Sequence, residues 1–222
     1  MIQIAHRGHS DFYKDNTIKA FIDAYENNFE MIELDVVLTK DNKIAIYHDT
    51  FINDKLIKDL KYNELRDIDN DIILLELFFK IININKIKVY IDIKGNNDIS
   101  KYLHKILKNK NLKNIYVASF NTLILNDLQK LNSDYQFGLI TENLFENDIL
   151  SYYIKKYNLK FIAFHWTMLD KYTIDFLHKN NILVFAYTCK NNNILLFMEK
   201  FDIDGIVTNY KINKIKKKKS KK

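Results

Sequence analysis

The sequence predicts an α/β fold in which eight β-strands form a parallel sheet within one domain. Short runs of β-branched and aromatic residues alternate with amphipathic stretches of helical length, which is the pattern of repeated strand–helix units. The 222 residues are 47% hydrophobic and 28% charged, a balance typical of a globular protein with a sizeable core. Such units either close into a barrel or form an open doubly wound sheet, and periodicity alone fits both arrangements.

The expected strands are spread over the whole chain. They lie at residues 2–6, 31–37, 88–94, 114–119, 136–140, 160–165, 182–187 and 203–208. Apolar residues at helical spacing predict helices between them at residues 17–27, 99–108, 122–131, 148–157, 169–180 and 193–201. Residues 51–84 are expected to supply one more helix, whose ends the pattern does not define.

A small β-hairpin is expected directly after the second strand. The strand-like residues 43–48 follow Asp41-Asn42, a dipeptide suited to the positive φ of a tight turn. We therefore expect residues 43–48 to fold back on the preceding strand. Asn28 follows the first helix, where asparagine tolerates the left-handed conformation that ends many helices.

One domain at residues 1–213 and a disordered lysine-rich tail at 214–222 are the expected organisation, since neither a Pro/Gly/Ser-rich linker nor a sequence repeat divides the chain. The tail holds seven lysines, and removing seven positive charges from the formal net charge of +6 leaves −1. A solvated tail is expected, and the alternative is an arm that makes weak contact with an anionic membrane or binds nucleic acid or a targeting receptor. The near-neutral body argues against specific nucleic-acid binding.

A cytoplasmic location is expected. No apolar run is long enough to cross a bilayer, so no transmembrane segment is predicted. The N-terminus lacks the basic start, apolar stretch and cleavage site of a secretory signal. Cys189 is the only cysteine, which suits a reducing compartment and excludes an intramolecular disulfide. The oligomeric state cannot be predicted.

Two carboxylates share one face of the second strand. Side chains alternate along a strand, so Glu33 and Asp35 point one way while Leu34 and its apolar neighbours point the other. A polar strand face in water is the ordinary interpretation. In a barrel, however, the outward face meets helices and must be apolar, so both acids would point inward near the end where chemistry occurs.

The third strand repeats this arrangement with Asp92 and Lys94 on one face. A surface ion pair explains these two residues equally well in isolation. Together with Glu33 and Asp35, Asp92 completes a set of three oxygen ligands, which suits a hard divalent cation such as Mg²⁺ or Ca²⁺. Zinc is less favoured because the sequence shows neither a cysteine cluster nor paired histidines.

Two histidines stand at the ends of strand-like runs. His6 and His48 are each placed where an imidazole can face a pocket and exchange a proton. A lone histidine is more often structural. Arg7-Gly8 makes His6 notable, because arginine offers a planar fork for phosphate and glycine lets the backbone approach a ligand closely.

An ordered set of motifs carries a family resemblance. In the first part of the chain these are Ile4-Ala5-His6-Arg7-Gly8, Asp15-Asn16-Thr17 with Ala20-Phe21, Ile32-Glu33-Leu34-Asp35-Val36, Leu38-Thr39-Lys40-Asp41 and His48-Asp49. Later motifs are Tyr90-Ile91-Asp92-Ile93-Lys94, Ser119-Phe120-Asn121 and Asp204-Gly205-Ile206-Val207-Thr208-Asn209-Tyr210. Over residues 2–210 the set resembles the glycerophosphodiester phosphodiesterases.

The resemblance implies a TIM (β/α)8 barrel that hydrolyses small glycerophosphodiesters to glycerol 3-phosphate and an alcohol. It implies a divalent metal held by Glu33, Asp35 and Asp92. It also implies acid–base catalysis by His6 and His48. Phosphate contacts are implied for Arg7 and Lys94.

The sequence departs from the family pattern at a few positions. Asp15 and Asp92 are aspartates where the family usually has glutamate. Tyr187 replaces the usual tryptophan, and Lys211 replaces the usual proline. The shorter carboxylate of Asp92 still binds a hard cation but shifts it or admits a water. Trp166 and Tyr187 are candidates to line the leaving-group side of the pocket, with core packing as the alternative for both.

Other functions stay open at the level of the sequence. A lysophospholipase D or sphingomyelinase D-like activity on a lipid substrate is the enzymatic alternative, although the His6-Arg7-Gly8 and Asn16-Thr17 elements argue against the sphingomyelinase D branch. A barrel that binds phosphodiesters or lipid headgroups without turnover is the non-catalytic alternative. Two histidines beside three carboxylates argue against it, since a binding protein needs no general acid.

Overall fold

Eight parallel strands form a closed barrel in the computed structural model, which describes residues 1–132 and 134–212. The strands are β1 (Ile2–Ala5), β2 (Met31–Leu38), β7 (Lys88–Ile93), β8 (Ile115–Ser119), β9 (Gln136–Thr141), β10 (Leu159–His165), β11 (Leu183–Cys189) and β12 (Gly205–Thr208). Each pairs with the next along this series, and β1 pairs with both β12 and β2. This closure confirms the TIM barrel and excludes the open sheet.

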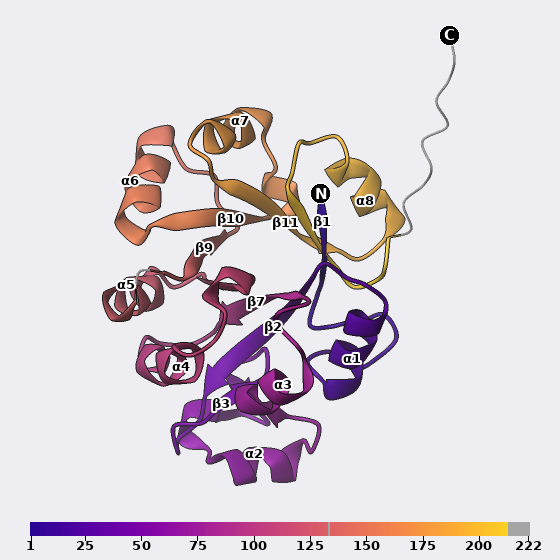
Figure 1. Cartoon of the computed structure of the whole chain (residues 1–222), viewed down its shortest axis with the longest axis vertical. Coiled ribbons are helices and arrows are strands. Elements are labelled where there is room, and N and C mark those ends of the chain that lie inside the picture. The colour runs from indigo at the N-terminus through magenta and orange to yellow at the C-terminus, as the bar shows by residue number, and fades with distance from the viewer. Residues whose placement is uncertain (133, 213–222) are drawn as a thin grey trace.

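Helices cover the outside of the strands, as Figure 1 shows. They are α1 (Ile18–Glu26), α2 (Tyr62–Ile68), α3 (Leu75–Ile81), α4 (Ile99–Leu107), α5 (Thr122–Leu131), α6 (Asn147–Tyr157), α7 (Lys171–Lys179) and α8 (Asn192–Met198). Short 3₁₀ turns lie at η1 (Ile57–Asp59), η2 (Leu112–Asn114) and η3 (Trp166–Met168). Apolar side chains between these helices and the strands form the larger buried core.

Local signals place several helix ends close to where the sequence predicts them. The hydroxyl of Thr17 accepts a hydrogen bond from the backbone N–H of Ala20, which caps the first helix. Asn28, just beyond that helix, has a φ of 57°, as expected for a left-handed terminator. The turn residue Asn42 has a φ of 60°.

Aromatic side chains fill the barrel interior. Tyr90, Phe161 and Phe185 contact one another there, with Tyr90 and Phe161 edge to face at 5.3 Å between ring centroids. Gly138 leaves the space for the ring of Phe161, since a Cβ at that glycine would lie 2.1 Å from it. The barrel is therefore a packed core, and ligands are confined to its ends.

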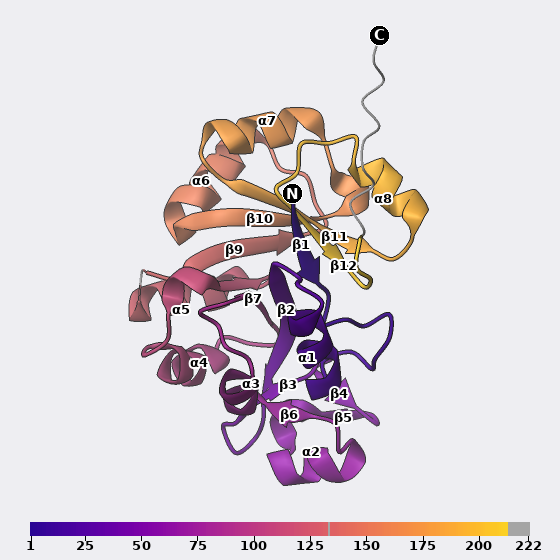
Figure 2. The ribbon, with the colours of Figure 1, turned by 45° about the vertical axis from the view of Figure 1, so that its right-hand side comes forward.

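A small insertion separates β2 from β7. β3 (Ile44–Ile46) runs antiparallel to β2, which confirms the expected hairpin, and β6 (Ile73–Leu74) pairs with β3. β4 (Phe51–Ile52) and β5 (Lys55–Leu56) form a second hairpin. Figure 2 shows these strands gathered with α2 at one end of the molecule, where they enclose a separate apolar cluster.

The insertion holds two helices, α2 and α3, in place of the single helix expected within residues 51–84. A turn at Asp69 divides them, because its carboxylate accepts the backbone N–H of Asp71 while its carbonyl accepts that of Ile72. Such local bonds compete with helix continuation. The periodic pattern does not reveal this short interruption.

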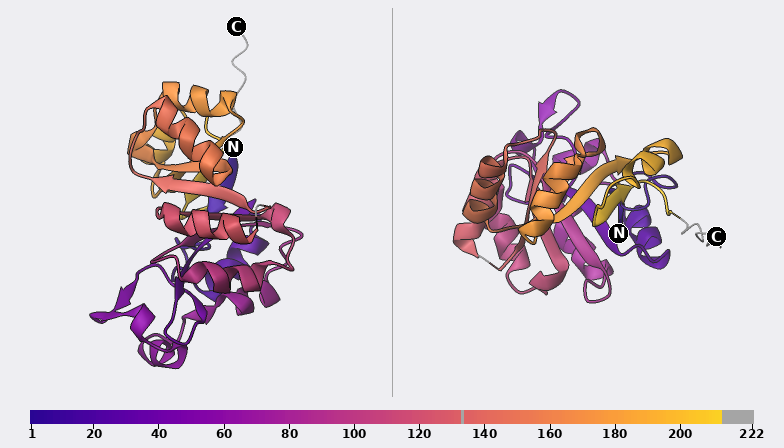
Figure 3. Two further views of the ribbon diagram at one scale, coloured as in Figure 1. Left: turned by 90° about the vertical axis from the view of Figure 1, so that its left-hand side faces the viewer. Right: turned by 90° about the horizontal axis from the view of Figure 1, so that it is seen from above.

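Figure 3 shows the insertion and the α6–α7 region at opposite ends of the molecule. No helix in residues 1–132 or 134–212 has both the length and the apolar character needed to span a membrane. The tail predicted at residues 214–222 lies outside the described residues.

Candidate active site

Two neighbouring barrel strands bring the three predicted acidic residues together. Glu33 and Asp35 lie on β2 and Asp92 lies on β7, and the parallel register sets Asp35 directly opposite Asp92. Each of the three carboxyl groups is buried, with residue exposures of 1 to 7%. One oxygen from each lies within 4.8 Å of the others. The alternation of side chains along the strands therefore points all three inward.

Two cations face this acidic cluster. The Lys94 ammonium lies 2.6 Å from Asp92 Oδ2 and 3.1 Å from Asp35 Oδ1. The Arg7 guanidinium lies 3.0 Å from Asp35 Oδ2 through Nε and 2.8 Å from Asp15 Oδ2 through Nη1. Both residues predicted to contact phosphate are thus paired with carboxylates, and Asp35 is shared between them.

The backbone of Arg7 also shapes the site. Arg7 has a φ of 55°, and its N–H donates to Glu33 Oε2 at 2.8 Å. Gly8 follows with a φ of 81°, and a Cβ there would lie 2.6 Å from the backbone carbon of Ala20. Glycine is required because this turn packs against α1.

Proton affinities differ across the acidic cluster. Burial, followed by the Asp35 and Asp92 charges, raises the pKa of Glu33 well above its usual value. Burial raises the pKa of Asp92 to about 7 despite the opposing charge of Lys94. Burial would also raise the pKa of Asp35, but the charges of Lys94 and Arg7 outweigh it and lower that pKa. Without a further cation, the site therefore favours the ionised form of Asp35 and the neutral forms of Glu33 and Asp92.

A divalent cation fits this set of residues. Three carboxyl groups outnumber the two adjacent cations, and Asp15 takes up part of the charge of Arg7. Asp92 Oδ1 is buried without a hydrogen-bond partner among the described residues. An unpaired buried carboxylate oxygen is costly, and metal coordination removes that cost. The cluster is therefore suited to a divalent metal.

Asn16 positions Asp35 and was assigned no role from the sequence. Its amide Nδ2–H donates to Asp35 Oδ2 at 2.9 Å, and its Oδ1 accepts the backbone N–H of Asp35 at 3.3 Å. Its φ of 58° and a bond from its N–H to the Arg7 carbonyl fix it in the β1–α1 loop. The sequence offered one signal for such a role, because Asn16 is an amide residue in a loop that follows a barrel strand, where functional residues of this fold lie.

His6 stands at the end of β1 beside the acidic cluster. Its Nδ1 lies 2.7 Å from Asn209 Oδ1, directly after β12, where sequence analysis also assigned no role. An amide oxygen only accepts, so Nδ1 carries the hydrogen and Nε2 keeps its lone pair. Burial, followed by the charge of Arg7, lowers the pKa of His6 to about 4. The imidazole is therefore neutral at neutral pH and suited to accept a proton.

His48 approaches from the insertion. The N–H of Tyr47 donates to the Asp35 carbonyl at 3.1 Å, which fixes the segment after β3 against β2. His48 Nδ1 lies 2.7 Å from Asp49 Oδ1, and the carboxylate accepts its hydrogen. The His48 side chain is 40% exposed. It is the more accessible of the two histidines, at the edge of a cavity of about 200 Å³ that Arg7 also lines.

Tyr187 and Trp166 belong to a chain of aromatic rings that begins at Lys94. The Lys94 ammonium lies 5.7 Å from the ring centroid of Phe120, which meets Tyr187 edge to face at 6.3 Å. Tyr187 contacts His165, which contacts Trp166. Trp166 packs on its other side against Phe197 of α8. Tyr187 therefore lies closer to the acidic cluster along this chain, whereas Trp166 packs toward the outer helices.

Comparison with known proteins agrees with the barrel fold. The model of the glycerophosphoryl diester phosphodiesterase family matches residues 6–212. A glycerophosphodiester phosphodiesterase of Caldanaerobacter subterraneus is 29% identical, with 92% of each chain covered. The crystal structure of a Thermotoga maritima enzyme of that name is 26% identical, with a TM-score of 0.80 and 94% of each chain covered.

A third similarity concerns the fold. An Oleispira antarctica phosphodiesterase, solved in complex with the product sn-glycerol-3-phosphate, superposes with a TM-score of 0.85 at 18% identity, covering 95% of this chain and 93% of that one. The family match spans nearly all described residues, including both histidines and all three carboxylates. The chain belongs to the glycerophosphoryl diester phosphodiesterase family.

Proposed function

We propose that this chain catalyses the metal-dependent hydrolysis of glycerophosphodiesters to glycerol 3-phosphate and an alcohol. The observation that carries the proposal is the convergence of Glu33, Asp35 and Asp92 within 4.8 Å, in a chain of this family. His6 and His48 stand at the ends of strands that border this cluster. A phosphodiester hydrolase needs this combination of a cation and proton-transfer groups.

Glu33, Asp35 and Asp92 are the proposed metal ligands, with Mg²⁺ or Ca²⁺ as the proposed ion. Carboxylate oxygens are the preferred ligands of both ions. When bound, the ion supplies positive charge to the phosphodiester oxygens. Asn16 holds Asp35 in the orientation that coordination requires, through the two hydrogen bonds to its carboxylate and backbone.

His6 is the proposed base and His48 the proposed acid. His6 Nε2 accepts a proton from the attacking hydroxyl, either water or a hydroxyl of the substrate's own glycerol. His48 donates a proton to the departing alkoxide as the phosphorus–oxygen bond to the alcohol breaks. Asn209 and Asp49 hold the two rings through their Nδ1–H groups, so each Nε2 is the atom free to exchange protons.

Arg7 and Lys94 are the proposed stabilisers of negative charge on the phosphoryl oxygens. An ammonium has three N–H groups and a guanidinium five, so both keep donors beyond those that contact Asp15, Asp35 and Asp92. Charge that develops in the transition state then meets donors already fixed in place. Tyr187 and Trp166 are proposed to line the leaving-group side, with Tyr187 nearer the acidic cluster.

A matrix of metals and substrates tests the proposal. The protein, stripped with chelator, receives Mg²⁺, Ca²⁺ or Mn²⁺ and is assayed on glycerophosphocholine, lysophosphatidylcholine and sphingomyelin, with products identified by ³¹P NMR. We expect glycerol 3-phosphate from glycerophosphocholine. Release of choline from lysophosphatidylcholine alone would instead establish the lipid-directed alternative. Binding without hydrolysis of any substrate would establish the non-catalytic barrel.

The cytoplasmic location and weak membrane contact through the lysine-rich tail stay predictions from the sequence. The division into a barrel at residues 1–213 and a tail at 214–222 is likewise proposed. Deleting residues 214–222 tests two of these predictions. Weaker vesicle binding than that of the full chain would support membrane contact through the tail, and unchanged hydrolysis would support a barrel that is independent of it.

A further inference from the structure

A second cavity lies beside the acidic cluster, on the side of Lys94. It has a volume of about 560 Å³ and is enclosed by the ends of β2 and β7, the start of α4, and the insertion from Thr50 to Lys58. Lys94 belongs to both places, because its ammonium contacts Asp92 and Asp35 while its side chain lines the cavity. Lys94 is therefore the residue that the acidic cluster and this cavity share.

The cavity is rich in positive charge. Four lysines line it, Lys40, Lys58, Lys94 and Lys101, against a single acid, Asp98. Within the described residues Lys58 and Lys101 make no ion pair, whereas Asp98 accepts a hydrogen bond from the Asn96 amide at 3.0 Å. The charges of Lys58 and Lys101 are thus left without an ion-pair partner in the described part of the chain, whereas Lys94 is paired with Asp92 and Asp35.

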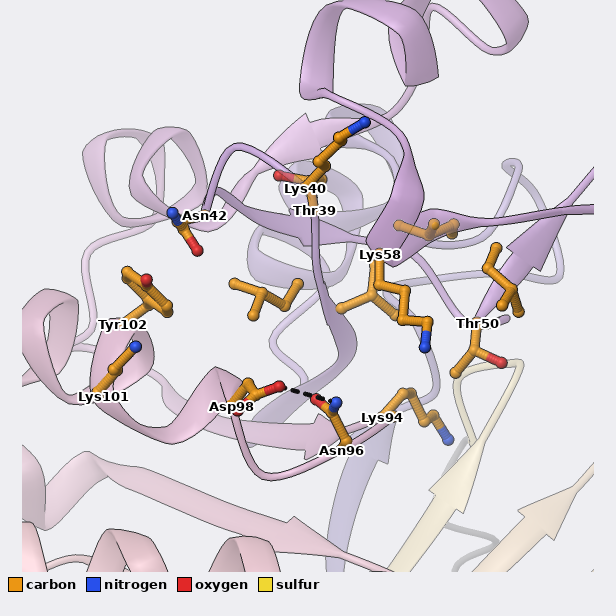
Figure 4. A pocket seen from close by; sticks show the side chains of 15 residues that line it. Thr39, Lys40, Asn42, Thr50, Lys58, Lys94, Asn96, Asp98, Lys101 and Tyr102 are labelled. Atoms are coloured by element: carbon orange, nitrogen blue, oxygen red, sulfur yellow. Dashed lines mark hydrogen bonds between the residues drawn. The ribbon is translucent and has the colours of Figure 1, made fainter.

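Two of these lysines bracket the space (Figure 4). Lys58 extends from η1 with its ammonium toward the side on which Thr50 and Lys94 lie. Lys101 stands at the other side, its ammonium 4.8 Å from the ring centroid of Tyr102. Lys40 lines the cavity with its stem, and its ammonium points away. Of the two, Lys58 therefore lies on the Lys94 side of the cavity, and Lys101 lies on the opposite side.

The backbone leaves this space open next to Lys94. Gly95 has a φ of 83°, and a Cβ built on it would meet only Thr50 Cγ2, at 3.9 Å. The chain can therefore turn away after β7 without filling the cavity. Val37 and Leu38 at the end of β2 supply apolar wall, so the cavity suits an anion carried on a short carbon chain.

The cavity on the His48 side has the opposite character. Asp49, Asp69 and Asp71 line it together with Lys14, which both Asp69 and Asp71 neutralise. An additional negative charge on a ligand is thus favoured on the Lys94 side and disfavoured on the His48 side. The two cavities therefore differ in the sign of the additional charge that they favour.

We propose that the lysine-lined cavity binds a second anionic group carried by the leaving alcohol, so that glycerophosphodiesters with an additional phosphate or carboxylate are preferred substrates. The proposal rests on the phosphodiesterase activity proposed above and names its substrate class. Lys58 is the principal determinant of this specificity, and Lys101 contributes at longer range. Neither residue takes part in the proton transfers or in metal binding.

Two substrates that differ by one charged group test the proposal. Glycerophosphoglycerol releases neutral glycerol, whereas bis(glycerophospho)glycerol releases an alcohol that keeps a second phosphodiester. The ratio of kcat/KM for the second over the first, corrected for its two equivalent ends, is measured for wild type, Lys58→Gln and Lys101→Gln. We expect a ratio of about 10 in low salt, reduced roughly fivefold by Lys58→Gln and less by Lys101→Gln.

Lys55→Gln is the matched control, since Lys55 lies in the same insertion, on β5, and does not line the cavity. We expect its ratio to equal that of wild type. All variants should hydrolyse glycerophosphoglycerol at the wild-type rate. Raising the salt to about 0.5 M should reduce the wild-type ratio, because screening weakens exposed charges.

The outcomes separate the two proposals. An unchanged ratio in Lys58→Gln, with active enzyme, overturns the specificity proposal and leaves the phosphodiesterase intact. If neither substrate is hydrolysed with any metal, the proposed activity fails, and calorimetric titration with bis(glycerophospho)glycerol then tests the cavity alone. Weaker binding by Lys58→Gln than by Lys55→Gln supports an anion site, and equal binding overturns it.

Discussion

Asp92 is the residue at which protons and a metal ion compete most directly. Burial raises its pKa to about 7 and raises the pKa of Glu33 well above its usual value, so protons compete with a cation at a higher pH than at exposed carboxyl groups. A cation binds only after these protons leave. We expect the apparent affinity for Mn²⁺, measured by calorimetry, to fall by roughly tenfold or more from pH 8 to pH 6.

The direction of this pH effect follows from the sign of the shifts. A raised carboxyl pKa means that lowering the pH through 7 adds protons to the metal-free site and weakens metal binding. Asp35 has a lowered pKa and stays ionised throughout this range. Affinity that is constant from pH 8 to pH 6 would contradict the assignment of Asp92 and Glu33 as ligands.

Asn16 offers a test of positioning. Asn16→Gly removes both hydrogen bonds to Asp35, and glycine still accepts the φ of 58°. We expect metal affinity to weaken by about 10- to 100-fold, the usual effect of losing a group that orients a ligand. Asn28→Gly is the control, since Asn28 has a φ of 57° at the end of α1, and its metal affinity should match wild type.

The two histidines are tested by truncation. His6→Ala and His48→Ala should each lower kcat/KM on glycerophosphocholine by about 10²- to 10⁴-fold, because each removes one proton-transfer group. Circular dichroism should show both variants folded. His104→Gln serves as the histidine control, since His104 bonds to Tyr135 on the outer layer. Near-normal turnover in both alanine variants would refute the catalytic roles.

Sequence reasoning identifies the ligands better than the residues that hold them. The period of two along a strand is enough to place Glu33 and Asp35 on one face. Asn16 and Asn209 lie in loops, where no period exists, and their bonds to Asp35 and His6 depend on how the chain turns after β1 and β12. Asparagine is also so abundant in this chain that its presence alone carries little information.

At the scale of elements, the β1–α1 loop has the least tolerance for change. Gly8 and Gly95 have nearly equal φ values of 81° and 83°. A Cβ at Gly8 meets the backbone of Ala20 within 2.8 Å, whereas one at Gly95 meets only Thr50 Cγ2, at 3.9 Å. We expect Gly95→Ala to cost about 1–2 kcal/mol from backbone strain. Gly8→Ala adds a steric clash and should cost about 2–5 kcal/mol.

Urea denaturation of both glycine variants measures this difference. Equal losses of unfolding free energy would show that the clash between the Gly8 turn and α1 is relieved by a small movement. A larger loss for Gly8→Ala would show that the turn carrying Arg7 is held against α1 by close packing.

Strands and outer helices are predictable here because burial imposes periods of 2 and 3.6 on their sequences. The insertion is not, apart from its first hairpin, because α2, α3, β4 and β5 are short and their boundaries depend on turns such as that at Asp69. The lysine-lined cavity is formed between this insertion and α4. Its existence therefore follows from tertiary structure, and its lysines carry no signal in the linear sequence.

At the scale of the whole molecule, barrel closure assembles the site. The pairing of β1 with β2 brings His6 and Arg7 beside Glu33 and Asp35, and the pairing of β2 with β7 adds Asp92. The strand–helix pattern alone fits an open sheet equally well. The ordered family motifs were the sequence feature that favoured the barrel. One closed sheet thus explains why residues from three distant segments meet.

The central claim is that Glu33, Asp35 and Asp92 form one metal site on which hydrolysis depends. The most direct measurement is the rate of glycerol 3-phosphate release from glycerophosphocholine by chelator-stripped protein as Mn²⁺ is added back, for wild type and Glu33→Gln. The account predicts saturable recovery in wild type and little recovery in Glu33→Gln, which keeps an oxygen for the Arg7 N–H. Full hydrolysis by stripped wild type in chelator, or equal recovery by Glu33→Gln, would contradict it.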